Sequence, residues 1–192
     1  MEITIDQRIY DFLKEHLSVK RYQHTLRVME AGISLAKIHK VNVKKVAYAC
    51  LLHDSAKGNE EYFLKKYVSQ TGWLFSSLDS DMSQKKIIHG PLAALIAMNE
   101  FFVVDQEVLE GMIYHTTGRS DMSTLEKIVF LADKIEAQRK YKGVVKLRNL
   151  AKRDLDEGVF YSMENTLRYL LDKRESIALS TIKTRNEILK RR

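Results

Sequence analysis

Apolar residues recur every three or four positions through almost the whole chain, which is the spacing of one face of an α-helix. This spacing predicts helices over about residues 6–17, 20–39, 83–101, 105–115, 123–137, 155–173 and 181–191. The HGP at 89–91 is expected to interrupt the third of these early. Asn42 and Asn59 stand where a side chain can cap two further helices, and shorter elements are predicted from about residue 143. Residues 71–83, TGWLFSSLDSDMS, lack a helical period and are predicted to form a loop.

The composition favours an all-α fold and a single domain. Hydrophobic residues make up 45% of the 192 positions and charged residues 30%, which is the balance of a soluble globular domain. One proline and eight glycines are too few for a turn-rich β architecture. No repeat, low-complexity segment or linker divides the sequence, so we expect one domain over residues 1–192.

Several features predict a cytoplasmic protein. The single cysteine, Cys50, cannot form an internal disulfide, lies in an apolar run and suits a reducing compartment. The N-terminal segment is acidic and amphipathic, unlike a signal peptide, and no uncharged apolar run reaches the roughly 18 residues of a membrane span. The net charge of +7 permits a polyanionic partner, but basic runs of this kind are more typical of solvated faces.

Polar residues stand at the ends of the predicted helices, next to small or turn-forming residues. They are His24, His53, Asp54, His89, His115 and Asp133. A lone histidine at the edge of an apolar face is more often a hydrogen-bonded core residue than a ligand, but an ordered set of this kind favours a metal site. A metal would also offset the cost of burying the two aspartates. His16 and His39 lie in charged contexts and are expected to be surface residues.

The residue types at this site suit a particular ion and a particular chemistry. Imidazole nitrogens with carboxylates suit iron, manganese, zinc or cobalt, and the near absence of cysteine argues against a structural zinc site. Lys57 follows Asp54 by about one helical turn, where its ammonium can face an anion, and Thr116 offers a hydroxyl. Because a metal lowers the pKa of bound water, hydroxide becomes available to attack phosphorus. The sequence therefore predicts metal-assisted hydrolysis of a phosphoester or phosphoanhydride.

The same residues resemble the HD-domain metal-dependent phosphohydrolases, an all-helical family with the order H…HD…D. Finer signatures are RYQHTLRV from 21, LLHDSAKG from 51, HGPLAA from 89, YHTTGRSDMSTLEKIVFLADKIE from 114 and TIKTRNEIL from 181. They are similar to the YqeK family of bacterial symmetrical dinucleoside-tetraphosphate hydrolases, which cut diadenosine tetraphosphate into two ADP. The similarity runs from about Arg21 to Leu189 and implies a helical HD-domain bundle, with an HD core over about 20–140 and C-terminal helices over about 141–192.

This resemblance implies a role for each site residue. Iron, or else manganese, zinc or cobalt, would be bound by His24, His53, Asp54 and Asp133. Catalytic roles are implied for Asp54, Lys57, His89 and His115, and the two histidines would either bind a second ion or contact phosphates. Nucleotide contacts are implied for Arg21, Lys57, His89, His115, Thr116, Arg139 and Arg185.

Two stretches depart from the family pattern. Residues 135–139 read IEAQR where the family tends to have IEPGR, and Ala178, Leu179 and Ser180 replace a common His-Pro pair. The departures affect the placement of Arg139 and of the residues around the base, and they leave the metal ligands in place.

The expected partner is a dinucleoside polyphosphate, with ADP or GDP as product. Neither a membrane nor a nucleic acid is expected, and a homodimer is compatible with the sequence. Two alternatives remain at this point. One is another HD-domain phosphohydrolase that acts on a nucleoside monophosphate, a nucleoside triphosphate or a cyclic dinucleotide. The other is a non-catalytic nucleic-acid-binding module, which the charge favours but which lacks an aromatic-rich sheet motif or a recognition helix.

Overall fold

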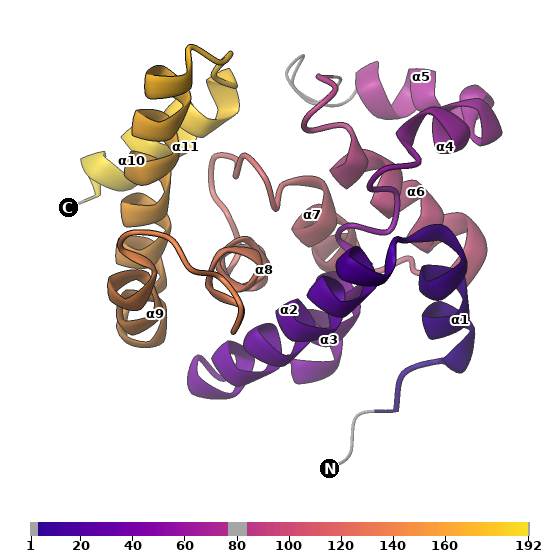
Figure 1. The fold of residues 1–192 in the computed structure, drawn as a ribbon, viewed down its shortest axis with the longest axis horizontal. Helices are drawn as coiled ribbons and strands as arrows, with labels where there is room; N and C mark the ends of the chain where they lie inside the picture. Colours follow the sequence, from indigo (N-terminus) through magenta and orange to yellow (C-terminus); the bar gives the residue numbers. More distant parts are fainter. Residues whose placement is uncertain (1–3, 77–83, 192) are drawn as a thin grey trace.

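A computed structural model describes residues 4–76 and 84–191, which form helices and no strand (Figure 1). The helices are α1 Gln7–His16, α2 Val19–Ile38, α3 Val43–Leu52, α4 Glu60–Lys66, α5 Val68–Ser76, α6 His89–Phe101, α7 Gln106–Ile113, α8 Thr124–Ile135, α9 Val144–Arg153, α10 Leu155–Lys173 and α11 Leu179–Lys190. The all-α fold predicted from the apolar spacing is confirmed. None of the helices in the described ranges is long and apolar enough to cross a membrane.

Most helix ends lie where the sequence predicts them, because the local capping chemistry is strong. Asn42 accepts a hydrogen bond from the Lys45 amide at 3.1 Å and caps α3 as expected. The helix predicted from residue 83 begins only at His89, after a turn over residues 84–88. Pro91 therefore lies in the first turn of α6, where its missing N–H leaves no intrahelical bond unmade.

Two local predictions were wrong. Part of the loop predicted over 71–83 is helical, since α5 extends to Ser76, and the rest of it, 77–83, lies outside the described residues. Thr71 is buried, and its amide donates to the Tyr67 carbonyl at 3.0 Å. Tertiary packing therefore makes this segment helical although its apolar residues lack a helical spacing. Asn59 precedes α4 without capping it, because its side chain donates to the His16 carbonyl instead.

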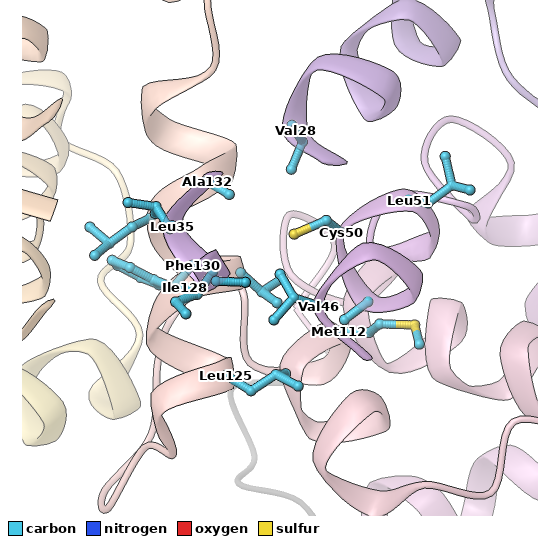
Figure 2. Close-up of a cluster of buried hydrophobic side chains, with 14 of the residues drawn as sticks. Val28, Leu35, Val46, Cys50, Leu51, Met112, Leu125, Ile128, Phe130 and Ala132 are labelled. Carbon is cyan, nitrogen blue, oxygen red and sulfur yellow. The ribbon is translucent and has the colours of Figure 1, made fainter. Parts of the chain in front are cut away.

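The main core lies where α2, α3, α7 and α8 meet. Helix α2 packs against α3 and α8, and α7 packs against α3, α6 and α8. Figure 2 shows the side chains that these helices bury together, among them Val28, Val46, Met112 and Ile128. Cys50 belongs to this core, as predicted, and burial raises the pKa of its thiol. Residues distant in sequence are thereby held in one rigid block.

The C-terminal helices cover one side of this block. Helices α9 and α10 pack against α8, and α11 packs along α10. In Figure 1 α10 and α11 lie to one side of α8, and α4 to α6 lie to the other. The ends of α2, α3, α6, α7 and α8 come together between these two sides, and the polar residues predicted from the sequence lie at these ends.

Candidate metal centre and active site

The predicted site residues are brought together by five helices. His24 lies in the second turn of α2, His53 and Asp54 follow α3, His89 begins α6 and His115 follows α7. Asp133 lies in the last turn of α8. The four histidines and Asp54 are each no more than 5% exposed, so polar atoms that are far apart in sequence share one buried position.

One group of ligand atoms comes from His24, His53 and Asp54, which each offer an atom within 4.8 Å of the others. The Asp54 Oδ2 atom lies 3.5 Å from His53 Nε2 and 3.8 Å from His24 Nε2. Asp133 is not a member of this group of three, but its Oδ1 lies 3.0 Å from His24 Nε2 and 4.0 Å from His53 Nε2. All four ligands implied by the family resemblance are therefore adjacent.

The His53 ring shows that this group fits a cation. Its Nδ1 lies 2.6 Å from the Cys50 carbonyl, which can only accept, so Nδ1 carries the hydrogen. Its Nε2 is buried and has no hydrogen-bond partner, although it faces two carboxylates. Burial opposes a charge on His53, but the Asp54 and Asp133 carboxylates and the hydrogen bond to the Cys50 carbonyl together outweigh it and raise the pKa of His53. The group therefore attracts a positive charge to the side of Nε2, and a divalent ion can supply it in place of a proton.

A second group comes from Asp54, His89 and His115, which also each offer an atom within 4.8 Å of the others. The other oxygen of Asp54, Oδ1, lies 3.3 Å from His89 Nε2 and 3.8 Å from His115 Nε2. The two oxygens of one carboxylate thus face two different groups of nitrogen atoms.

Hydrogen bonds orient both rings of the second group. His115 Nδ1 donates to the Met112 carbonyl at 2.6 Å, so its Nε2 carries a lone pair. Lys57 Nζ donates to His89 Nδ1 at 2.9 Å, which leaves the hydrogen on His89 Nε2, 3.1 Å from His115 Nε2. Gly90 allows α6 to approach this close, since a Cβ there would lie 2.9 Å from the Met112 carbonyl oxygen. The series of hydrogen bonds that runs from Lys57 through His89 and His115 to the Met112 carbonyl therefore has a donor and an acceptor at each step without an ion.

Burial makes the second group electrically different from the first. It lowers the pKa of His89 to about 4 and that of His115 well below its usual value. Burial also lowers the pKa of the Lys57 ammonium. The Thr116 hydroxyl lies 3.1 Å from His115 Nε2 and 3.4 Å from His89 Nε2. Two neutral rings, a hydroxyl and an ammonium suit phosphate oxygens, and they can hold an ion only if the His89 proton moves.

Two arginines contact the carboxylates of the site. Arg21 donates to Asp54 Oδ2 at 2.7 Å, and Arg139 donates to Asp133 Oδ1 at 2.7 Å and to the Asp133 carbonyl at 2.9 Å. Burial alone would raise the pKa of both aspartates. His53 beside Asp54 holds the pKa of that carboxyl well below its usual range, and the hydrogen bond from His24 together with the charge of Lys134 does the same for Asp133. A cavity of about 490 Å³ opens beside both arginines and His24, so a bound anion can reach them.

Three polar residues of the site were missed by the sequence reasoning. Glu136 Oε1 lies 3.4 Å from His24 Nδ1, and Arg27 donates to Glu136 Oε2 at 2.7 Å. Lys134 Nζ lies 3.4 Å from the His115 carbonyl. A signal for the first two was present, because Arg27 follows His24 and Glu136 follows Asp133 by three positions, which places each pair on one helix face.

Other predicted residues lie apart from the cluster. Arg185 donates to Glu164 at 2.7 Å with its guanidinium 5.3 Å from the centroid of the Phe160 ring, and it lines none of the described cavities that adjoin the site. Its nucleotide contact stays a prediction. His16 and His39 were expected on the surface, but both are half-buried and lie within hydrogen-bond distance of backbone carbonyls, at 3.0 Å and 2.8 Å.

Comparison with known proteins places this cluster in a family. The sequence pattern of the family described as HD domain matches residues 21–138. The chain belongs to the HD domain family. The matched segment runs from the first turn of α2 to just beyond α8 and holds every residue of both ligand groups. Helices α9 to α11 lie outside it.

The relatives are similar over almost their whole length. The symmetrical bis(5'-nucleosyl)-tetraphosphatase of Halalkalibacterium halodurans is 38% identical over 92% of this chain and 93% of its own length. That of Bacillus subtilis is 33% identical, over 91% of this chain and 92% of its own. A crystal structure from Clostridium acetobutylicum, described as a predicted HD superfamily hydrolase involved in NAD metabolism, superimposes with a TM-score of 0.89 at 34% identity over all of both chains. The resemblance inferred from the motifs is confirmed.

Proposed function

We propose that this protein hydrolyses dinucleoside tetraphosphates symmetrically, so that diadenosine tetraphosphate gives two ADP. The activity named for the relatives supports this substrate, since the similarity covers nearly all of each chain. The chemistry is supported by a single observation, the shared position of Asp54. One of its oxygens faces His24 and His53, and the other faces His89 and His115. This arrangement puts metal-binding atoms directly beside groups suited to phosphate.

Iron is the proposed ion, with manganese, zinc or cobalt as alternatives, because the donors are imidazoles and carboxylates. His24, His53, Asp54 and Asp133 would hold the first ion, and Asp54, His89 and His115 offer atoms for a second. When bound, such an ion acts as a Lewis acid and lowers the pKa of water toward neutrality. The chain's own contribution is to fix a hydrogen on Nδ1 of His53 and of His115, through the Cys50 and Met112 carbonyls, so that Nε2 of each ring is directed inward.

The substrate's phosphates would be held by the cations and the hydroxyl around the cluster. Lys57 places an ammonium 2.9 Å from His89, and Thr116 places a hydroxyl on the same side. Arg21 and Arg139 lie on the side of the 490 Å³ cavity and can turn from their aspartates toward a polyphosphate. The negative charge of four phosphates would then be shared between the two sides of the site.

Symmetric cleavage is a statement about which bond breaks. The oxygen of water would bond to the second phosphorus, and the bond from the bridging oxygen to that phosphorus would break. The bridging oxygen would leave with the third phosphate, as part of the second nucleoside diphosphate. A positive group near the leaving diphosphate stabilises the charge that develops there, which is the role proposed for Arg139.

Product analysis tests this proposal directly. Diadenosine tetraphosphate is incubated with the metal-loaded enzyme in ¹⁸O-labelled water, and the products are separated by chromatography and weighed by mass spectrometry. We expect ADP alone, with one labelled oxygen in half of the molecules. Chelator-treated enzyme is the control and should give no product. AMP and ATP in equal amounts would contradict the proposed register, and turnover of other nucleotides alone would favour a different HD-domain phosphohydrolase.

A further inference from the structure

The cavity of about 490 Å³ beside Arg21 and Arg139 also contains the ring of a tyrosine. Tyr141 lines this cavity and is 41% exposed, and its hydroxyl donates to the Lys134 carbonyl at 2.9 Å. His24 lines the same cavity, which therefore reaches the candidate metal centre. A ring that is fixed at its hydroxyl and open to a cavity can stack on a flat, uncharged group.

The segment that carries Arg139 and Tyr141 is held in place by a helix outside the HD-domain match. Arg148 on α9 donates to the Glu136 carbonyl at 2.8 Å and to the Arg139 carbonyl at 3.2 Å. It also donates to the Ile135 carbonyl at the end of α8, at 2.9 Å. The guanidinium of Arg139 and the ring of Tyr141, two positions apart, are therefore placed in the cavity before any substrate binds.

The remaining lining of this cavity is mainly basic. Its basic residues are Lys20, Arg21, Arg27, Arg139 and Lys140. Glu136 is the one acidic residue among the lining residues that the structure describes, and Arg27 donates to its carboxylate at 2.7 Å. In a cavity of about 910 Å³ on the other side of the site, Glu60 and Glu61 lie among the lysines. The cavity with Tyr141 therefore suits a polyphosphate that carries an aromatic base better than the cavity with the two glutamates does.

We propose that this cavity binds the nucleoside that departs with the leaving diphosphate, and that its base stacks on the Tyr141 ring. The assignment rests on the proposed function, in which Arg139 faces the leaving diphosphate. It adds to that function a place for the nucleoside that is covalently joined to this diphosphate and must therefore lie close to Arg139. Tyr141 then makes the site distinguish a substrate with two nucleosides from a substrate with one.

A substrate that lacks one nucleoside provides the test. Adenosine 5'-tetraphosphate keeps the four phosphates of diadenosine tetraphosphate, and hydrolysis at the same bond gives ADP and pyrophosphate. We define the preference of the enzyme as its kcat/KM for diadenosine tetraphosphate divided by its kcat/KM for adenosine 5'-tetraphosphate. Two exposed tyrosines give matched variants, because Tyr62 is 53% exposed and lines the cavity with the two glutamates. The preference is measured for the metal-loaded wild type, Y141A, Y141F and Y62A.

We expect Y141A to lower the kcat/KM for diadenosine tetraphosphate by about tenfold or more, the effect of removing one ring on which a base stacks. The kcat/KM for adenosine 5'-tetraphosphate should stay at the wild-type value. Y141F keeps the ring and should keep the preference, and Y62A should match the wild type for both substrates.

Equal losses for both substrates in Y141A would overturn the assignment, because Tyr141 would then support the site without contacting the second nucleoside. A wild type with no preference would overturn it as well. So would a preference that falls in Y62A and not in Y141A, which would place the nucleoside beside Lys57. If Y141A does not fold, Y141L removes the flat ring, and an unchanged preference in it would likewise exclude the cavity. A wild type that leaves diadenosine tetraphosphate intact would instead overturn the proposed function, and this assignment with it.

Discussion

Asp54 is shared by two groups of side chains that differ in charge. His24 and His53 lie on the side of its Oδ2 atom. A second carboxylate, that of Asp133, is also there, with its Oδ1 3.0 Å from His24 Nε2. On the side of its Oδ1 atom lie His89 and His115, and no carboxylate other than Asp54 is among the ligand atoms described there. The Lys57 ammonium lies on that side, with its Nζ 2.9 Å from His89 Nδ1. The first group therefore contains two carboxylates, each paired with an arginine, and the second contains neutral rings beside a positive charge.

The difference in charge indicates a difference in task. Two carboxylates beside imidazole nitrogens favour a cation, whereas neutral rings beside an ammonium suit an anion. The folding of the two groups agrees with this division. The first group is held by α2, α3 and α8, which pack against one another in the main core, and the second comes from the ends of α6 and α7. The sharper comparison is thus between a metal-holding side and a phosphate-holding side of one carboxylate.

The largest expected effect separates the two sides by metal content. H53A removes an inward lone pair that has no other partner, so we expect loss of the tightly bound ion. Turnover should fall by about 10³-fold or more, because several kcal/mol of charge stabilisation are lost with the metal. H115A should retain at least one ion per chain. Metal analysis of freshly purified protein measures both.

Control variants keep this comparison specific. His16 and His39 lie outside both ligand groups, so H16A and H39A should keep the wild-type metal content. Full metal content and normal turnover in H53A would contradict the assignment of the first group as the metal site. Equal metal loss in H53A and H115A would instead mean that both sides hold ions with similar affinity.

The second effect concerns Lys57, which marks the phosphate side. K57M keeps the length of the side chain and removes its charge and its hydrogen bond to His89. We expect turnover to fall by about 2–4 kcal/mol of transition-state energy, a typical cost of one lost electrostatic contact. Steady-state kinetics give this value, and metal analysis should show an unchanged ion content. If K57M loses metal but keeps its turnover per bound ion, Lys57 supports metal binding and not the binding of phosphate.

The metal ligands and the pair that supports them were not equally predictable from the sequence. His53, Asp54 and Asp133 end apolar helices, and a polar residue there stands out against the spacing of its neighbours. The supporting pair of Arg27 and Glu136 lies in charged stretches, where a buried ion pair looks like a solvated surface. Its burial depends on the contact between α2 and α8, which is a long-range feature.

In the fold as well, features with a strong local pattern were predicted, and features that depend on contacts between helices were missed. Helices α2 and α10 were predicted within about one residue, and the start of α3 was predicted from its Asn42 cap, because the apolar spacing and the caps agree there. The helical part of 71–83 was missed, since α5 depends on packing against α4 rather than on its own pattern. The hydrogen bond from Lys57 to His89 could not be predicted either, because it joins two turns that are brought together only by the packing of the whole bundle.

The third effect uses pH and the metal-free protein. His53 has a raised pKa, so its contribution to stability is present below the usual value of 6.5 and is lost as pH rises through the folded value. His89 has its pKa lowered from 6.5 to about 4, so its contribution is present above 6.5 and is lost as pH falls toward 4, up to about 3 kcal/mol. Ring NMR signals followed from pH 8 downward should show His53 protonating first. The opposite order would reverse the assignment of charge to the two sides.

The smallest effect tests whether Glu136, which contacts the far side of the His24 ring, increases the affinity of the first group for its ion. Glu136 lies 3.4 Å from His24 Nδ1 and is held by Arg27, so it favours the tautomer in which His24 Nε2 carries the lone pair. E136Q keeps the shape of the side chain and removes the charge. Titration of the metal-free protein with the ion should show an affinity about 10–100-fold weaker, the usual cost of losing such a partner. The matched control is E100Q, because Glu100 also accepts hydrogen bonds from two side chains, Lys66 and Tyr67, but lies outside both ligand groups. If E136Q and E100Q bind the ion equally well, His24 owes its orientation to Asp133 alone, and the negative charge behind it is incidental.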